Sequence, residues 1–291
     1  MKDHKEEHLI TLNKSAISII FGVCSLSLAA PVIANTYKGE ASPPTLSGFY
    51  LGGFGGWGSF NDFQVTQSGV AMFSPALNAA GIGSLSAPLA VDAVGNTGSN
   101  SVGFGGIHLG YEWLAPAWWV TPAIELEGIY FSKTFDASDL DNSSIVLTEH
   151  DFDDTFPTKT GIVLINGVFQ LNCFRMSMVH PYVGFGLGAA ILSINSADSL
   201  QVSPPEAGVN HFNSNEESSD WTFAAQAKAG LRFALSERVQ LFAEYRFLYL
   251  GNTEFTFGST FYPTHVPTTS WKVDFHDMYA NAGALGIEFK V

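Results

Sequence analysis

The sequence has little charge, almost no cysteine and few long apolar runs. Of its 291 residues only 14% are charged, whereas 13% are aromatic and 29 are glycine. A transmembrane helix needs about 20 apolar residues. Only one apolar run, at residues 16–30 near the N-terminus, approaches that length. The net charge of −14 argues against nucleic acid as a partner, because phosphate binding requires a positive surface.

The apolar run at residues 16–30 is typical of a secretory signal. It follows Lys14 and leads into Val32-Ile33-Ala34, which places small residues where signal peptidase cleaves. We expect residues 1–34 to be removed and residues 35–47 to form a short periplasmic lead-in. Since Cys24 is then lost, Cys173 remains alone and an intrachain disulfide is excluded.

From residue 48 to 291, apolar runs of period two are joined by connections that alternate in length. The long connections are 61–100, 134–157, 195–220 and 252–276, and the short ones are 115–117, 174–179 and 236–238. Outer-membrane barrels combine tight periplasmic turns with longer external loops. The sequence therefore predicts an all-β fold over residues 48–291: an eight-stranded antiparallel up-and-down transmembrane β-barrel with four long external loops.

Seven of the eight runs separate an apolar face from a polar or glycine-rich face. In one run Ile107 and Leu109 oppose His108, and we assign the apolar face to lipid and the other to the lumen. Glycines 184, 186 and 188 are expected to leave lumen space beside larger side chains. Aromatic residues near the run ends predict two interfacial girdles, comprising Trp57, Trp113, Trp118, Trp119, Tyr130, Trp221, Tyr249 and Tyr279.

The alternative is a soluble β-sandwich with amphipathic strands. Its polar faces would meet open water, whereas here they mix charges with glycine, which favours a narrow lumen. The first run, at residues 48–60, carries glycine and aromatic residues on both faces, so its orientation stays open.

The predicted inward faces carry five acids, four bases and one histidine. They are His108, Glu112, Glu125, Glu127, Lys228, Arg232, Glu244, Arg246, Glu288 and Lys290. Buried charges without partners are costly, and an eight-stranded barrel is just wide enough for side chains to fill. We therefore predict a salt-bridged ladder that largely plugs the lumen, with Arg232 opposite Phe242 and diagonal to Glu244. The alternative is a narrow gated pore, although a selectivity filter favours one sign of charge.

Two of the long connections have unusual compositions. Residues 136–154 carry seven acids, which suits either a solvated face or loose binding of divalent cations, but they lack the spacing of a dedicated calcium loop. Residues 70–91 are apolar. We expect this segment to pack on itself, to fold over the barrel mouth, or to bind a host or envelope partner.

An enzyme that modifies lipid A is a further alternative. His150, His211, His265 and His276 all lie in or beside long connections that also contain serine. No pair stands in a diagnostic context, because nucleophile, base and orienting acid must meet in space. We expect no catalytic residues, no cofactor and no dedicated metal site.

Four segments carry a resemblance to a known family. They are residues 47–53 (SGFYLGG), 180–190 (HPYVGFGLGAA), 230–247 (GLRFALSERVQLFAEYRF) and 286–289 (GIEF). Together they resemble the eight-stranded outer membrane protein β-barrel domain family, which includes opacity-type porins, bacterial surface antigens and OmpA-like barrels. One departure is the end of the chain, where Val291 stands in place of the terminal aromatic residue typical of such barrels.

The resemblance implies the outer membrane of a Gram-negative bacterium as location. It also implies membrane lipid, lipopolysaccharide and the barrel assembly machinery as partners. Members of the family serve as surface antigens, adhesins, structural anchors or low-conductance pores, and supply no catalytic residues to assign here. We therefore expect a non-enzymatic surface protein that acts structurally and through its long loops, with a small porin as the alternative.

Overall fold

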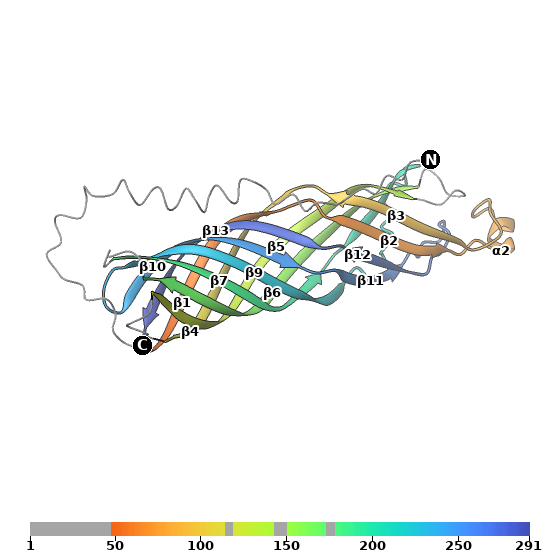
Figure 1. Ribbon diagram of the computed structural model, residues 1–291. Helices are drawn as coiled ribbons and strands as arrows, with labels where there is room; N and C mark the ends of the chain where they lie inside the picture. Colours follow the sequence, from red (N-terminus) through yellow and green to blue (C-terminus); the bar gives the residue numbers. More distant parts are fainter. Residues whose placement is uncertain (1–47, 114–118, 143–149, 173–177) are drawn as a thin grey trace, which may run out of the picture. The chain divides into compact units, whose positions relative to one another are not determined.

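The computed structural model describes residues 48–113, 119–142, 150–172 and 178–291. Most of them lie in long antiparallel strands that cross the molecule obliquely (Figure 1). In this part of the chain, no helix combines the length and the apolar character needed to cross a membrane. The expected signal, the lead-in, Cys173 and Trp118 all lie outside the described residues.

Eight of the strands form the wall of a barrel. They are β1 (Gly48–Phe60), β4 (Asn100–Glu112), β5 (Val120–Asn142), β6 (Asp151–Leu171), β7 (Val179–Ile194), β9 (Ser218–Ala234), β10 (Val239–Leu250) and β13 (Met278–Lys290). Each pairs antiparallel with its two neighbours in this order, and β13 pairs back to β1. The ring is closed, so its wall has no free edge. This confirms the predicted eight-stranded up-and-down barrel.

The outer surface of the ring is an apolar band. Ile107 is 66% exposed, whereas its neighbour His108 is 2% exposed, as the alternation predicts. The exposed Trp119, directly before β5, and the exposed Tyr130 on β5 stand eleven positions apart, which spans about 25 Å for a strand tilted by about 45°. That is the height of the apolar band of a membrane barrel, so the ring is a transmembrane β-barrel.

The first ring strand, whose faces the sequence leaves open, follows the same alternation. Phe49, Leu51 and Trp57 are exposed on the outside, while Tyr50 and Phe54 are buried inside. Both faces of β1 thus contain glycines beside aromatic residues, which hides the alternation from a hydropathy pattern.

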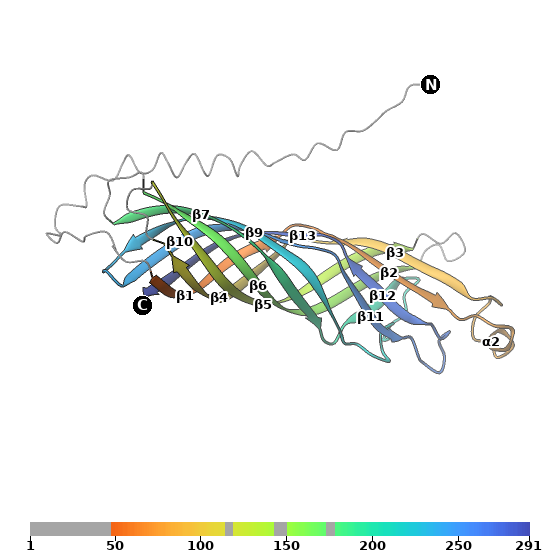
Figure 2. The ribbon, with the colours of Figure 1, turned by 60° about the horizontal axis from the view of Figure 1, so that its bottom comes forward.

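The long connections are strands rather than irregular loops. They contain β2 (Gln64–Ala71), β3 (Leu89–Thr97), β8 (Asp198–Ser203), β11 (Thr253–Ser259), β12 (Ser270–Phe275) and the short helix α2 (Pro75–Ala79). These strands join the far ends of β5 and β6 in the order β11-β12-β2-β3-β5-β6-β8. We call this assembly the distal sheet; Figure 2 shows it running on beyond the ring, with α2 at the tip of the β2–β3 hairpin.

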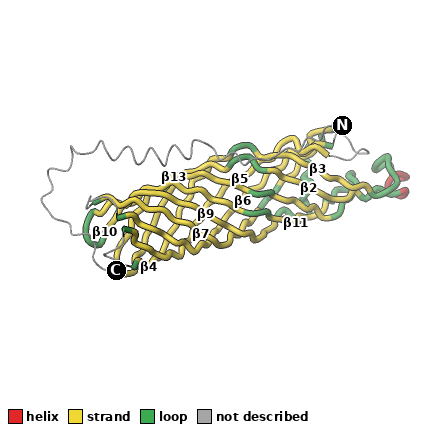
Figure 3. The backbone as a smooth tube through the Cα atoms, in the orientation of Figure 1, coloured by secondary structure: helices red, strands yellow, loops and turns green. Residues whose placement is uncertain are grey.

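The acidic segment expected as a loop at residues 136–154 is largely part of two ring strands. Residues 136–142 continue β5 and residues 151–154 begin β6, while 143–149 lie outside the described residues. The distal sheet also joins connections far apart in the sequence, since Ser68 of β2 pairs with Lys272 of β12. Strands β5 and β6 therefore run without interruption from the ring into the distal sheet, whereas short loops separate the other distal strands from the ring (Figure 3).

An aromatic core fills the interior at the distal end. Its rings are in close contact: the centroids of Phe212 and Phe257 are 4.6 Å apart, and those of Phe156 and Phe275 are 5.1 Å apart. The buried members are Phe60, Phe63, Phe131, Phe135, Phe152, Phe156, Phe212, Phe255, Phe257, Trp271 and Phe275. Large buried aromatic side chains dominate the stability of such cores, and these rings belong to one hydrophobic cluster that continues into the ring.

Candidate functional site

All ten predicted inward residues lie inside the ring, at the end opposite the distal sheet. Nine are buried, and Lys290 is partly exposed. They come from five strands: His108 and Glu112 from β4, Glu125 and Glu127 from β5, Lys228 and Arg232 from β9, Glu244 and Arg246 from β10, and Glu288 and Lys290 from β13. We call this set the lumen network.

The two carboxylates of β5 form the centre of the lumen network. Glu125 lies 2.5 Å from the Lys228 ammonium and 3.2 Å from the Arg232 guanidinium, and it accepts a hydrogen bond of 2.7 Å from the Tyr50 hydroxyl. Glu127 contacts Lys228 at 3.0 Å and also pairs with Arg246. Both acids therefore face bases that project across the lumen from β9 and β10.

Arg232 is held between two acids and two aromatic rings. Its guanidinium lies 3.0 Å from Glu288 and 4.7 Å from the centre of the Tyr182 ring. Phe242 stands directly opposite Arg232 on β10, as the turn position predicts. However, the ion pairs of Arg232 are with Glu125 and Glu288 rather than with the diagonal Glu244, because the side chain reaches across the lumen instead of along the sheet.

The remaining members of the lumen network are also paired. Glu244 contacts Arg246 and accepts a hydrogen bond of 2.5 Å from the Tyr182 hydroxyl. His108 lies 3.2 Å from Glu288, so it is a member of the network. Every charged group among the ten has a partner of opposite sign, which offsets the several kcal/mol that burying an unpaired ion costs.

Inward glycines make room for these side chains. A Cβ atom added at Gly186 would lie 1.9 Å from Asn166 Oδ1, and one at Gly52 would lie 2.2 Å from His108 Nε2. At Gly184 the nearest atoms belong to the Lys228 side chain. Gly188 differs from the expectation, because its Cβ would meet the backbone of Val163 rather than a side chain.

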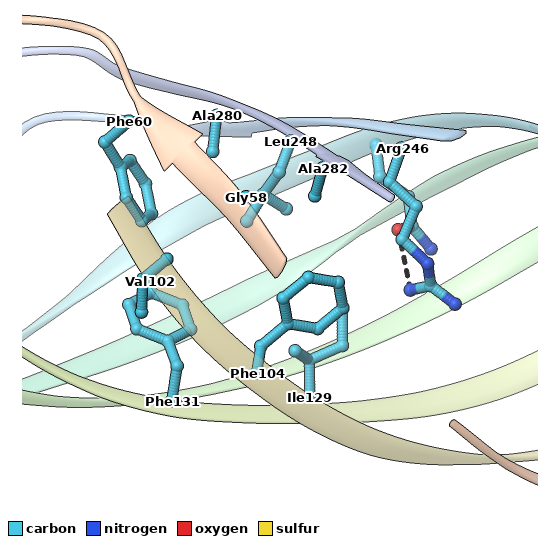
Figure 4. Close-up of a pocket in the computed structure, with 11 residues that line it drawn as sticks. Gly58, Phe60, Val102, Phe104, Ile129, Phe131, Arg246, Leu248, Ala280 and Ala282 are labelled. Atoms are coloured by element: carbon cyan, nitrogen blue, oxygen red, sulfur yellow. Dashed lines mark hydrogen bonds between the residues drawn. The ribbon is translucent and has the colours of Figure 1, made fainter. Parts of the chain in front are cut away.

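Above the lumen network the interior becomes apolar. A cavity of about 30 Å³ separates Arg246 from the aromatic core, which is room for one or two water molecules. Figure 4 shows its walls, formed by Phe60, Phe104, Ile129, Phe131 and Leu248, with Arg246 at one end. The cavity therefore lies between the buried charges of the lumen network and the rings of the aromatic core.

Two of the four histidines considered for the enzyme alternative form a cluster that the sequence does not predict. His211 and His265 come together, and each turns a ring nitrogen toward Glu206. Residues 206, 211 and 265 lie on two separate connections, so spacing in the sequence gives no signal for this cluster.

Neither a protein-family model nor a curated protein sequence matches the chain. Among solved structures it is similar to Neisserial surface protein A (NspA), at 13% identity over 84% of this chain and 98% of that one, with a TM-score of 0.41. OprG from Pseudomonas aeruginosa gives 12% identity, 84% and 97% coverage and a TM-score of 0.38. The outer membrane protease OmpT from Escherichia coli is 9% identical over 82% of this chain and 97% of that one, with a TM-score of 0.35. The fold assignment rests on the strand pairing described above.

Proposed function

We propose that this protein is a non-conducting surface protein of a Gram-negative outer membrane, in which a plugged barrel holds the distal sheet outside the cell as a binding surface. The observation that supports this proposal is that the buried ion pairs of the lumen network and the buried rings of the aromatic core both lie in the interior, with a cavity of only about 30 Å³ between them. A barrel that is packed along its length serves as a rigid anchor, so interactions with other molecules fall to its exposed parts.

The membrane surroundings follow from the exterior of the ring. Its apolar band faces lipid, and closed barrels of this kind belong to outer membranes. The distal sheet then lies on the external side, because the short turns of such barrels are periplasmic. In this setting the partners are membrane lipid and lipopolysaccharide around the band, and the barrel assembly machinery during insertion.

The tip of the β2–β3 hairpin is the part of the distal sheet best suited to bind a partner. Phe73 and Leu85 pack against the distal core, which anchors the segment. Between them, none of the residues of α2 is buried, and Met72, directly before Phe73, is 41% exposed. An exposed apolar tip on a rigid hairpin favours contact with a host or envelope protein.

Removal of the tip tests this proposal. The last pair of the β2–β3 ladder is Ala71 with Leu89, so residues 72–88 can be replaced by an Asn-Gly turn without shortening either strand. We expect cells that carry the shortened protein to lose binding to host cells or matrix, while heat-modifiable migration shows a folded barrel. Undiminished binding by the shortened protein would contradict the role of the tip.

The porin alternative requires a water path through the lumen. A pore would need the ion pairs of the lumen network and the aromatic core to move together. Conductance in a planar lipid bilayer distinguishes the two functions.

A further inference from the structure

A histidine and carboxylate cluster lies in the distal part of the molecule, outside the lumen network. His265 Nε2 is 3.0 Å from Glu206 Oε2, and His211 Nε2 is 3.8 Å from the same oxygen. The three ligand atoms lie within 4.8 Å of one another. Two imidazoles and one carboxylate that converge on a single point are the ligand set of many three-residue zinc sites.

The second nitrogen of each ring fixes its orientation. His211 Nδ1 lies 3.0 Å from the carbonyl oxygen of Ser199, and His265 Nδ1 lies 2.6 Å from that of Val266. A carbonyl only accepts hydrogen bonds, so each Nδ1 carries the proton and donates it. In a neutral ring Nε2 then presents a lone pair toward Glu206, and acceptors that face one another require a cation between them. Metal-binding histidines show this same backbone contact.

The rigid surroundings hold the cluster in place. His211 is 2% exposed and packs against Phe152 and Trp271, with ring centroids 5.1 Å and 5.9 Å away. Its backbone carbonyl accepts a hydrogen bond of 2.9 Å from the Thr260 hydroxyl. Asn213 on the same connection makes two hydrogen bonds to the backbone of Phe261, of 2.8 Å and 2.9 Å. The connections that carry the ligands are therefore tied together without a metal.

We propose that Glu206, His211 and His265 bind a divalent transition-metal ion, with zinc as the ion that fits best. A tetrahedral zinc ion about 2.0–2.1 Å from each ligand separates the ligand atoms by about 3.4 Å, close to the 3.0 Å and 3.8 Å found here. Imidazole ligands select zinc, copper or nickel over calcium and magnesium, which prefer oxygen. With three protein ligands, a tetrahedral ion would take water as its fourth ligand.

The bound ion links two connections of the distal sheet. Glu206 and His211 follow β8, while His265 lies between β11 and β12. The Glu206 side chain is 33% exposed and that of His265 is 17% exposed, so the ion reaches the site from solvent. This proposal is independent of the binding role of the β2–β3 tip.

Zinc titration of the whole protein tests the proposal. The protein is purified from membranes without a histidine tag, and Zn²⁺ binding is followed against a chromophoric chelator, with Co²⁺ absorption as a spectroscopic report of tetrahedral ligation. We expect one equivalent to bind. Glu206 and His265 lie at the rim of the site. The substitutions Glu206→Gln and His265→Gln should each weaken Zn²⁺ binding by about tenfold or more. His276→Gln removes a histidine outside the cluster and should leave binding unchanged.

Two results would overturn the proposal. One is the absence of stoichiometric zinc binding by the wild-type protein. The other is equal affinity in the Glu206→Gln, His265→Gln and His276→Gln variants, since zinc would then bind elsewhere. Heat-modifiable migration of each variant verifies that its barrel is folded, so that weaker binding reports the loss of a ligand.

Discussion

Single residues inside the ring are matched in size across neighbouring strands. Gly186 lies beside Asn166 and Gln226, and both of these side chains donate hydrogen bonds to Glu127, at 3.2 Å and 3.1 Å. The glycine therefore leaves the space in which these two side chains contact the lumen network. Period-two alternation predicts which residues point inward. It does not predict that Arg232 pairs with Glu288, because contacts across a lumen depend on strand tilt and stagger.

The substitution Gly186→Ala tests this matching. Its new Cβ would lie 1.9 Å from Asn166 Oδ1, and moving Asn166 disturbs the hydrogen bonds to Glu127. We expect a loss of about 1–3 kcal/mol in the free energy of unfolding, as for other overpacked interiors. The measurement is urea-induced unfolding in lipid vesicles.

Gly128→Ala is the matched control for this experiment. Gly128 also lies in a ring strand, but a Cβ there would have no atom within 4 Å. This variant should unfold at the same urea concentration as the wild type. Equal stability of the two variants would show that the lumen has spare room at Gly186.

At the scale of elements, the eight ring strands follow from the sequence, whereas the distal sheet does not. Its strands do carry period-two signals: Phe255 and Phe257 alternate with polar residues, as do Trp271, Val273 and Phe275. These runs are short, and they lie in connections whose length is typical of loops. Their partners are also far away in the sequence, as in the pairing of β2 with β12, and no local pattern specifies such a ladder.

The distal sheet should lose its order when its aromatic core is opened. Phe275 is 0% exposed and contacts Phe63, Phe156 and Phe255. Phe275→Ala should destabilise the distal sheet by about 3–5 kcal/mol, because it leaves a cavity among these rings. We expect rapid proteolysis of the distal strands while the ring keeps its heat-modifiable migration.

Phe261→Ala serves as the control, since Phe261 is 74% exposed. This variant should resist protease like the wild type. If Phe275→Ala were equally resistant, the core would not hold the distal sheet together. If it also unfolded the ring, the two parts would be one cooperative unit.

The whole molecule is a ring with an apolar outer band that continues into the distal sheet, and one hydrophobic cluster runs through both. In the proposed function, the lumen network closes the interior at one end and the aromatic core closes it at the other. The near balance of charge in the lumen is visible in the sequence and favours a plug. The aromatic core is not visible in the sequence, because it is built largely from the long connections. In this account the barrel is an anchor, and binding belongs to the distal sheet and its tip.

Conductance in a planar lipid bilayer tests the central claim most directly. The purified wild-type protein should insert without producing single-channel steps, because neither the lumen network nor the aromatic core leaves a path for ions. Reproducible openings, with a conductance that changes in Glu244→Gln or Arg246→Gln, would show that ions pass through the lumen and would contradict the plugged barrel.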